Sequence, residues 1–333
     1  MEEKIATTTT SDLPKLAVAP MIDWTDRHCR FFHRQITRRS MVYTEMIVDR
    51  AIIHGPRARL LRRDAAEHPV ALQVGGSDPA TLAQAVQLAA PFGYDQINLN
   101  VGCPSDRVQL GCFGAVLMKD PALVARCLSS MIEVAEVPVT VKCRIGVDDQ
   151  DPEVILPDFL SRVQDAGVTQ VTIHARKAWL QGLSPKENRD IPPLDYDLVL
   201  RMKARFPDIQ IALNGGVKTL AEAQDLLGQG LDGVMVGRAA YHEPMAVLGG
   251  ADALWGEDHA PDAFGVVQAM RPYIAAHLAD GGKLNQITRH MLGLFAGRPG
   301  ARTWRRMLSE GAARPGADLD LLDAALEEMT AAA

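Results

Sequence analysis

Residues 69–101, PVALQVGGSDPATLAQAVQLAAPFGYDQINLNV, decide the fold of this chain of 333 residues. Both ends of the stretch, PVALQVG at 69–75 and DQINLNV at 95–101, are short and rich in β-branched or other apolar residues, as buried parallel strands are. The region between them opens with Asp78-Pro79, an N-cap residue followed by proline at the first helical position. The stretch therefore predicts a strand, a helix and a second, parallel strand.

The same unit recurs along the chain. The strand-like runs are LAVA at 16–19, MVYTEM at 41–46, 69–75, 95–101, PVTVKCR at 138–144, QVTIHA at 170–175, IQIALN at 209–214 and DGVMVG at 232–237. Eight strand and helix units predict a closed parallel (β/α)8 TIM barrel, which usually holds roughly 250 residues. The alternative, a doubly wound open sheet, has less support because no GxGxxG motif follows the first strand.

After about residue 255 the apolar residues recur at helical spacing. The segments with this spacing are 263–279, 286–297, 302–310 and 319–329. We therefore expect a catalytic barrel over residues 1–250 and a small, all-helical domain over residues 255–333.

Composition, cysteines and the first residues restrict the class of protein. The chain is 47% hydrophobic and 23% charged, as in soluble globular proteins. It has no apolar run of the roughly 18 residues that a membrane span needs, and its polar, acidic start does not resemble a signal peptide. Its five cysteines include no CxxC pair, which disfavours disulfides and zinc. We expect a cytoplasmic protein with free thiols and without metal or membrane contact.

The charge distribution leaves nucleic-acid binding open. The formal net charge of −6 argues against a polyanionic partner, because phosphates are neutralised by Lys and Arg. However, residues 281–309 carry six Lys and Arg and no Asp or Glu, and residues 27–44 carry five Arg and no acid. On their own such runs are more often solvated surface than a binding site.

In barrel enzymes the active site lies at the carboxyl ends of the strands, so the polar residues there are candidates. They are Gln73, Asn98, Asn100, Cys103, Lys142, Arg144, His174, Arg176, the Asn214-Gly215-Gly216 run and the Gly237-Arg238 pair. The two glycine-containing loops follow the seventh and eighth strands, where barrels often bind a phosphate through backbone N–H groups. Tight turns would also use glycine, but the feature occurs in both loops, so we favour a phosphate site.

Three of these side chains suggest chemistry. Lys142 lies within an apolar strand, where an unpaired ammonium is costly, so it should serve an anion or a chemical step. It could form a Schiff base or hold the negative charge of a reduced flavin. His174 could equally be a satisfied core histidine. Cys103 could be a small buried hydrophobe, the role that we assign to the other cysteines, but it lies between glycine and proline at the expected rim of the site.

Long motifs resemble the tRNA-dihydrouridine synthase family, and within it the A-type subfamily. They are APMIDWTDRHCRFF at 19–32, YTEM at 43–46, HPVALQVGGSDP at 68–79, INLNVGCPSDRVQ at 97–109, VKCRIG at 141–146, IHARKAWLQGLSPKENRDIPPLDY at 173–196, NGGV at 214–217 and DGVMVGRAAY at 232–241. The resemblance spans nearly the whole expected barrel, and NVGCPSDRV with HARKAWLQGLSPKENR is far more specific than any single glycine motif.

The resemblance implies an FMN enzyme that uses NADPH to reduce uridine to dihydrouridine at positions 20 and 20a of the tRNA D-loop. It implies that FMN contacts Ala19, Pro20, Met21, Gln73, Lys142, His174, Asn214, Gly215, Gly216, Gly237 and Arg238. Cys103 matches the family's proton donor. Candidates for tRNA contacts are Asn100, Arg176, Lys177, Lys186, Arg189, Arg302 and Arg305.

The implied mechanism passes a hydride from reduced FMN to carbon 6 of the uracil and a proton from Cys103 to carbon 5. The target base must leave the RNA stack to reach a barrel mouth. Because the thiol must be protonated to act, we also expect Cys103 to lack the cationic neighbours that activate nucleophilic cysteines. We expect the protein to be monomeric.

Three other functions remain open from the residues alone. The first is an FMN barrel that acts on a small molecule and needs no basic helical domain. The second is a Schiff-base aldolase that uses Lys142. The third is a non-catalytic RNA-binding module, which would have no use for Cys103, Lys142 and His174 at strand ends.

Overall fold

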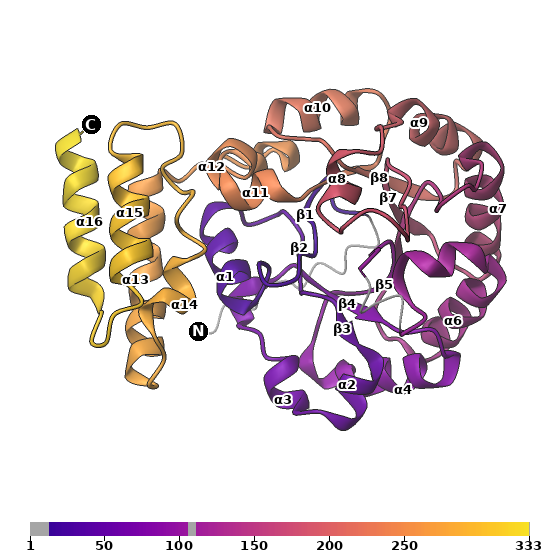
Figure 1. Ribbon diagram of the computed structural model, residues 1–333, viewed down its shortest axis with the longest axis horizontal. Helices are drawn as coiled ribbons and strands as arrows, with labels where there is room; N and C mark the ends of the chain where they lie inside the picture. The colour runs from indigo at the N-terminus through magenta and orange to yellow at the C-terminus, as the bar shows by residue number, and fades with distance from the viewer. Residues whose placement is uncertain (1–12, 106–110, 333) are drawn as a thin grey trace.

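The computed structural model describes residues 13–105 and 111–332. Parallel strands form one sheet in the order β1-β9-β8-β7-β6-β5-β4-β2, with β3 paired to β4. A parallel bridge between Ala17 and Met41 joins the two ends of this order, and Val18 N donates to Met41 O at 2.8 Å. The sheet therefore closes into the predicted (β/α)8 barrel, with helices around the strands (Figure 1).

The strand positions agree with the apolar runs of the sequence. The strands are β1 (Leu16–Val18), β2 (Val42–Tyr43), β3 (Ile47–Val48), β4 (Val70–Gly75), β5 (Gln96–Val101), β6 (Val139–Arg144), β7 (Gln170–His174), β8 (Gln210–Asn214) and β9 (Gly233–Val236). Every residue of β4 and β5 is buried. This burial on both faces is what a parallel strand enclosed by helices requires.

The second predicted strand, 41–46, is interrupted. It forms β2, ends at Tyr43, and pairing with β4 resumes only at β3. Between them the Thr44 hydroxyl donates to Glu45 O at 2.7 Å and accepts from Gln73 N at 3.0 Å. Thr44 N still donates to Ala71 O at 2.9 Å, but a side chain takes the place of the next ladder bond, so the expected uninterrupted strand is wrong.

The helices begin where the sequence predicts. In α4 (Pro79–Ala89) the Asp78 side chain accepts from Thr81 N at 2.8 Å, and in α6 (Pro121–Val134) Asp120 accepts from Leu123 N at 2.9 Å. Both have proline in the first turn. The other barrel elements are α1 (Arg27–Ile36), α2 (Asp49–His54), α3 (Arg57–Leu60), α7 (Pro152–Asp165), α8 (Glu187–Asp190), α9 (Tyr196–Arg205), α10 (Leu220–Gly228), α11 (Arg238–His242) and α12 (Pro244–Val247), with short 3-10 turns η1 (Ala65–Glu67), η2 (Ala90–Phe92), η3 (Gly114–Lys119) and η4 (Ala251–Trp255).

The C-terminal segment is helical and lies at one side of the barrel, next to α1 (Figure 1). It contains α13 (Ala263–Ala279), α14 (Leu284–Thr288), α15 (Ala301–Gly311) and α16 (Leu319–Ala332). The helix expected over 286–297 is wrong beyond Thr288, where turns follow. A Cβ at Gly293 would lie 2.1 Å from His242 O, and Gly297 has φ +79°, so close backbone contact and a left-handed residue replace the helix.

The inside of the barrel has its own small apolar cluster, formed by Ala17, Ala19, Met41, Tyr43, Ala71 and Met235. Polar side chains join it there: Tyr43 donates its hydroxyl to Gln96 Oε1 at 2.7 Å, and Gln96 Nε2 donates to Gln170 Oε1 at 3.0 Å. Since these buried groups are paired, the barrel interior is filled and closed below the strand ends.

Candidate active site

The sheet register brings the predicted site residues of β4 to β8 side by side. Gln73 pairs with Asn98, and Asn100 pairs with Lys142. Arg144 pairs with His174, which in turn pairs with Asn214. Except for Asn98, the third residue of β5, they belong to the carboxyl-terminal halves of their strands, so these side chains line one arc of the barrel at and just below its mouth.

The ends of β1 and β9 complete the mouth. A Cβ at Gly237 would meet Ala19 Cβ at 3.7 Å and the Met21 sulfur at 3.8 Å, so these residues are neighbours. Ala19 N donates to Val236 O at 2.8 Å. Pro20 between them is half-buried. Residues 19–21 and Gly237 therefore lie together at this end of the barrel.

The loop after β8 is shaped by its two glycines. Gly215 has φ +117° and Gly216 has φ +78°, conformations that favour glycine. A Cβ at Gly215 would lie 2.8 Å from the His174 ring. The Tyr196 hydroxyl donates to Gly215 O, which holds the loop against α9. Gly216 is exposed, so a phosphate could approach its backbone closely.

Cations gather beside this loop. Arg238 Nη2 lies 2.6 Å from Asp190 Oδ1, and both side chains are more than two-fifths exposed. Arg176 Nη1 donates to Pro192 O, while its Nε is buried and is one of two buried side-chain atoms without a partner among the described residues. Burial lowers the pKa of Arg189, and the charge of the neighbouring Arg238 lowers it further. This edge of the mouth is suited to an anion.

Lys142 and His174 lie at the bottom of the mouth and are strongly affected by burial. Burial, and then the Arg144 charge, lowers the pKa of Lys142 to about 8. The same causes lower the pKa of His174 well below its usual range, so its imidazole is neutral at neutral pH. A half-buried ammonium whose nearest charged groups include another cation is costly, and an anion next to it would relieve that cost.

Cys103 follows β5 in a loop held on both sides. Cys103 N donates to Asn100 Oδ1 at 3.0 Å, and Ala115 N donates to Cys103 O at 2.8 Å. Its thiol is partly exposed and lies 3.6 Å from the Ser105 hydroxyl. The backbone is therefore fixed while the sulfur remains accessible from the mouth.

The expectation that Cys103 lacks cationic neighbours is wrong. Lys142, Arg144 and Arg189 each interact electrostatically with Cys103, and this interaction would raise the pKa of each cation. The strand register explains the neighbours, because Lys142 lies beside Asn100 on the adjacent strand.

Sequence reasoning missed the structural role of Arg144 and Asn188. Arg144, buried in the site wall, donates to Gly102 O at 3.0 Å, Lys177 O at 2.9 Å and Asn188 O at 3.0 Å. The Asn188 side chain in turn binds the backbone of Trp179. It accepts from the backbone N–H at 2.7 Å and donates to the carbonyl at 2.8 Å. An arginine at a strand end in VKCRIG was a signal, but its carbonyl partners come from loops far apart in sequence.

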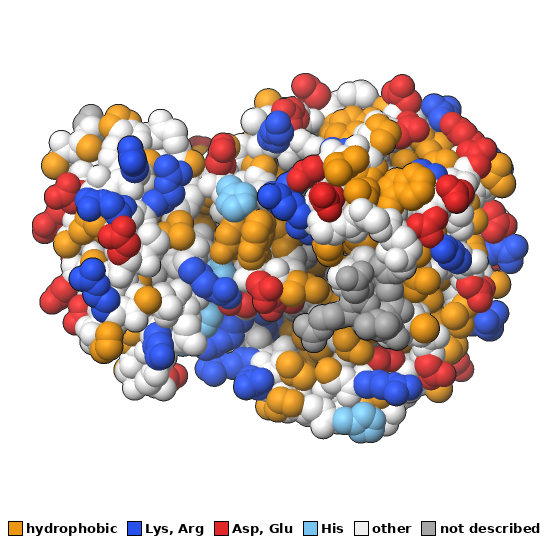
Figure 2. Space-filling view, viewed as in Figure 1, with side chains coloured by type: hydrophobic (Ala, Val, Ile, Leu, Met, Phe, Trp, Pro, Cys, Tyr) orange, Lys and Arg blue, Asp and Glu red, His pale blue; other side chains and the backbone are white. Residues whose placement is uncertain are grey.

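The expected tRNA contacts occupy two regions. Lys177, Lys186 and Arg189 lie on the segment after β7, and the Lys177 ammonium lies 5.4 Å from the Trp179 ring centroid. Arg302 and Arg305 are exposed on α15, among the C-terminal helices, where Lys and Arg side chains are spread over the surface (Figure 2). The 27–44 window is less available than its charge suggests, because Arg30 and Arg34 are buried.

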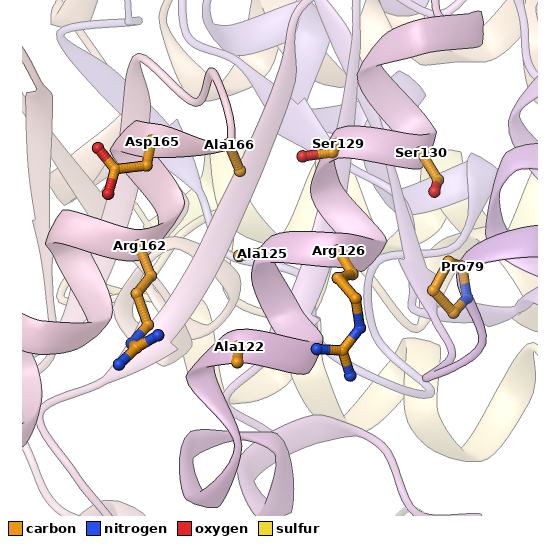
Figure 3. A pocket seen from close by; sticks show the side chains of 9 residues that line it. All are labelled: Pro79, Ala122, Ala125, Arg126, Ser129, Ser130, Arg162, Asp165 and Ala166. Atoms are coloured by element: carbon orange, nitrogen blue, oxygen red, sulfur yellow. The ribbon is translucent and has the colours of Figure 1, made fainter.

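A surface hollow elsewhere does not compete with the barrel mouth. It lies between α6 and α7 on the outer side of the barrel and is lined by helix residues such as Arg126, Ser129 and Arg162 (Figure 3). Within residues 13–105 and 111–332, no group of three His, Cys, Asp or Glu is placed to hold a metal ion. In the same ranges no helix is both long and apolar enough to traverse a bilayer.

Comparison with known proteins agrees with this geometry. A family model described as dihydrouridine synthase (Dus) matches residues 17–330. The tRNA-dihydrouridine(20/20a) synthase of Vibrio vulnificus is 55% identical over 317 residues, which cover 95% of this chain and 97% of the relative. Those of Vibrio parahaemolyticus (56% over 318 residues, 95% and 97%) and Escherichia coli K12 (55% over 316 residues, 94% and 91%) are similarly related. With a family match over most of its length and relatives at this level of identity, the chain belongs to the dihydrouridine synthase family.

Proposed function

We propose that this chain reduces uridine to 5,6-dihydrouridine in the D-loop of tRNA, at positions 20 and 20a. The family match and the names of the relatives support the reaction and the positions. The observation that carries the proposal within the molecule is the placement of Cys103. It follows β5 at the mouth of the barrel, next to the strand that carries Lys142, and its side chain is partly exposed.

The barrel mouth fits FMN. Lys142, a half-buried cation with no carboxylate among the charged groups acting on it within residues 13–105 and 111–332, would face the electron-rich ring, together with Gln73, His174 and the Ala19-Pro20-Met21 segment. Asn214, Gly215, Gly216, Gly237 and Arg238 would hold the single phosphate, where a dinucleotide would need a second site. Bound and reduced by NADPH, the flavin would supply a hydride to carbon 6 of the uracil.

The protein's own residues would then complete the reaction. Cys103 would give a proton to carbon 5 of the uracil, as a general acid, with Lys142, Arg144 and Arg189 as its charged neighbours. Asn100 fixes the Cys103 backbone through its side-chain oxygen. Hydride and proton would reach the base from opposite sides, which requires the uracil to lie between the flavin and Cys103.

The two parts of the chain would share the work. We assign residues 1–250 to FMN binding and chemistry and residues 255–333 to tRNA binding, in a monomeric, cytoplasmic enzyme. Asn100, Arg176, Lys177, Lys186 and Arg189 would contact the flipped uridine and its phosphates, and Arg302 and Arg305 the tRNA backbone. Flipping costs a few kcal/mol, which phosphate contacts on the helices would offset.

The decisive experiment maps dihydrouridine in tRNA from cells with and without this protein, and measures FMN in the purified protein. We expect loss of the modified base at positions 20 and 20a, and a yellow protein with one FMN per chain. A colourless protein that cannot be reconstituted with FMN would rule the proposal out. Loss at other uridines alone would retain the reaction but refute the assigned positions.

A further inference from the structure

A continuous chain of buried hydrogen bonds runs across three strands beneath the barrel mouth. Asn98 Nδ2 donates to the Thr140 hydroxyl at 2.8 Å, Gln73 Nε2 donates to Asn98 Oδ1 at 2.8 Å, and Asn100 Nδ2 donates to Gln73 Oε1 at 2.8 Å. All four side chains are at most 7% exposed. The chain starts at Thr140, inside β6, and ends at the loop that carries Cys103.

The direction of this chain is fixed at its Cys103 end. Asn100 Oδ1 accepts from the backbone N–H groups of Gly102 at 3.1 Å and Cys103 at 3.0 Å. A backbone N–H can only donate, so the oxygen of Asn100 must face the loop and its amide nitrogen must face Gln73. Each following amide is thereby oriented, and the last nitrogen, on Asn98, needs an acceptor.

Thr140 supplies that acceptor. Its hydroxyl oxygen accepts from Asn98, and its proton goes to Ile97 O at 3.4 Å. Without this oxygen Asn98 could satisfy its nitrogen only by rotating or flipping, and either change would mismatch the amides of Gln73 and Asn100. In a buried network a single unpaired member affects its neighbours, because the network stays ordered only when every group is satisfied.

We propose that Thr140 and Asn98 are positioning residues, which through Gln73 and Asn100 set the flavin-facing amide and the proton-donating thiol of Cys103 in one mutual geometry. The inference rests on the proposed function for the roles of Gln73 and Cys103. It adds that residues out of reach of flavin and base control the alignment of both, so that hydride donor and acid are positioned together.

The test uses three variants of the full chain loaded with FMN. Thr140→Val keeps the side-chain shape but removes the oxygen, and Thr140→Ser restores it. Thr172→Val is the matched control, because Thr172 is equally buried on the adjacent strand β7 and does not belong to the chain of bonds described here. Steady-state dihydrouridine formation gives kcat and KM for tRNA, and mass spectrometry gives the rates at which iodoacetamide alkylates Cys103 and exposed Cys112.

We expect Thr140→Val to lower kcat about tenfold, the loss that corresponds to one misaligned hydrogen bond, at unchanged KM for tRNA. We also expect it to change the alkylation of Cys103 but not of Cys112. Thr140→Ser and Thr172→Val should behave like the wild type. If Thr140→Val has normal kcat and normal Cys103 alkylation, or if Thr172→Val falls by the same factor, the positioning role is refuted.

The two proposals can fail separately. If wild-type protein forms no dihydrouridine, the proposed function is wrong, and the alkylation rates still decide whether Thr140 controls the Cys103 loop. If the wild type is active but Thr140→Val loses only FMN affinity, with normal kcat at saturating FMN, the inference is overturned while the function stands.

Discussion

The backbone of Cys103 is held by two hydrogen bonds while its side chain is partly exposed, which suits a residue that presents a proton to a bound base. We expect Cys103→Ala to bind FMN and tRNA and to accept electrons from NADPH normally. Its reoxidation by tRNA should be slower by about 10² to 10⁴, the usual contribution of general acid catalysis. Stopped-flow absorbance of the flavin would follow both half-reactions.

Cys112→Ala is the matched control for that prediction. Cys112 lies on the same connection between β5 and η3 but is exposed. It should leave both half-reactions unchanged. Reoxidation of Cys103→Ala at the wild-type rate would show that another group donates the proton.

Lys142 predicts a pH dependence of flavin binding. Because burial and the Arg144 charge lower its pKa to about 8, the free protein loses this cation as the pH rises through that value. In the proposed site the Lys142 ammonium donates a hydrogen bond to the electron-rich FMN ring, so FMN binds best to the protonated form and binding above pH 8 takes up a proton. We expect the affinity to weaken by up to about tenfold per pH unit there, since one proton is linked to binding.

Lys142→Met should remove this dependence and bind FMN more weakly at about pH 7, where the wild-type ammonium is charged. Fluorescence titration of FMN into the free protein, from about pH 7 to about pH 9.5, would compare the two. Parallel curves for wild type and variant would mean that Lys142 is not the group that titrates.

Single residues mark the limit of what the sequence predicts about the site. Lys142 was identifiable because a charge within an apolar strand is anomalous by itself. Thr140 was not identifiable, because a threonine in a strand is ordinary. Arg144 was visible as a polar residue at a strand end, but its role was not, because its partners are carbonyl groups of two separate segments, after β5 and after β7. The cations around Cys103 were likewise missed, since only the register of β5 against β6 brings them together.

At the level of elements, capping and strand type were predictable and interruptions were not. Asp78-Pro79 and Asp120-Pro121 begin helices because capping is local chemistry. The break between β2 and β3 depends on Thr44 bonding to Gln73 N on another strand, and the early end of α14 depends on Gly293 meeting His242. Both causes are tertiary contacts, which a local pattern does not contain.

The junction of α1 and α14 gives a prediction at this scale. Asp26 caps α1 by accepting from His28 N at 2.9 Å and Cys29 N at 3.0 Å, and it also pairs with Arg289 at 2.6 Å and His290 at 3.0 Å. Asp26→Ser should keep the cap and lose the pairs, whereas Asp26→Ala should lose both. We expect the alanine variant to be less stable than the serine variant by about 1 kcal/mol in urea unfolding.

The same junction should weaken in acid. Burial raises the pKa of Asp26, but the His290 and Arg289 contacts and the capping bonds outweigh it and lower the pKa below the unfolded value of about 4. A depressed carboxyl pKa contributes stability that is present above the unfolded value and is lost as the pH falls below it. Wild type and Asp26→Ala should therefore converge in stability below about pH 4; a constant difference would contradict the assignment.

At the scale of the whole molecule, the barrel was predictable from eight repeated strand and helix units. Each strand belongs to the same sheet, and parallel strands joined by helices can be arranged in few topologies. The sequence did not show that Ala17 and Met41 make the contact that closes the barrel, nor that the C-terminal helices lie beside α1. The molecule therefore has two sets of basic residues. One set lies on the C-terminal helices, and the other lies at the barrel mouth.

The last prediction concerns these helices as an RNA surface. Arg302 and Arg305 lie three residues apart on α15, whose opposite side buries Ala301, Trp304 and Leu308, so both arginines project outward. In Arg302→Ala/Arg305→Ala, tRNA binding should weaken and its log–log salt dependence should become shallower by about 0.7 to 0.9 per lost phosphate contact. FMN content should stay normal.

Arg162→Ala/Arg201→Ala, two arginines on the outer helices α7 and α9, removes the same charge and should leave the slope unchanged. Nitrocellulose filter binding at several salt concentrations would separate the two pairs. Equal slopes in both double variants would place the RNA surface elsewhere, and the exposed arginine of the 27–44 window, Arg38, would be tested next together with half-buried Arg27. Arg30 and Arg34 are buried in hydrogen bonds to the barrel, so the 27–44 window offers fewer phosphate contacts than its five arginines suggest. If the salt dependence of Arg302→Ala/Arg305→Ala becomes shallower by the amount expected for two lost phosphate contacts, α15 is favoured as the RNA surface.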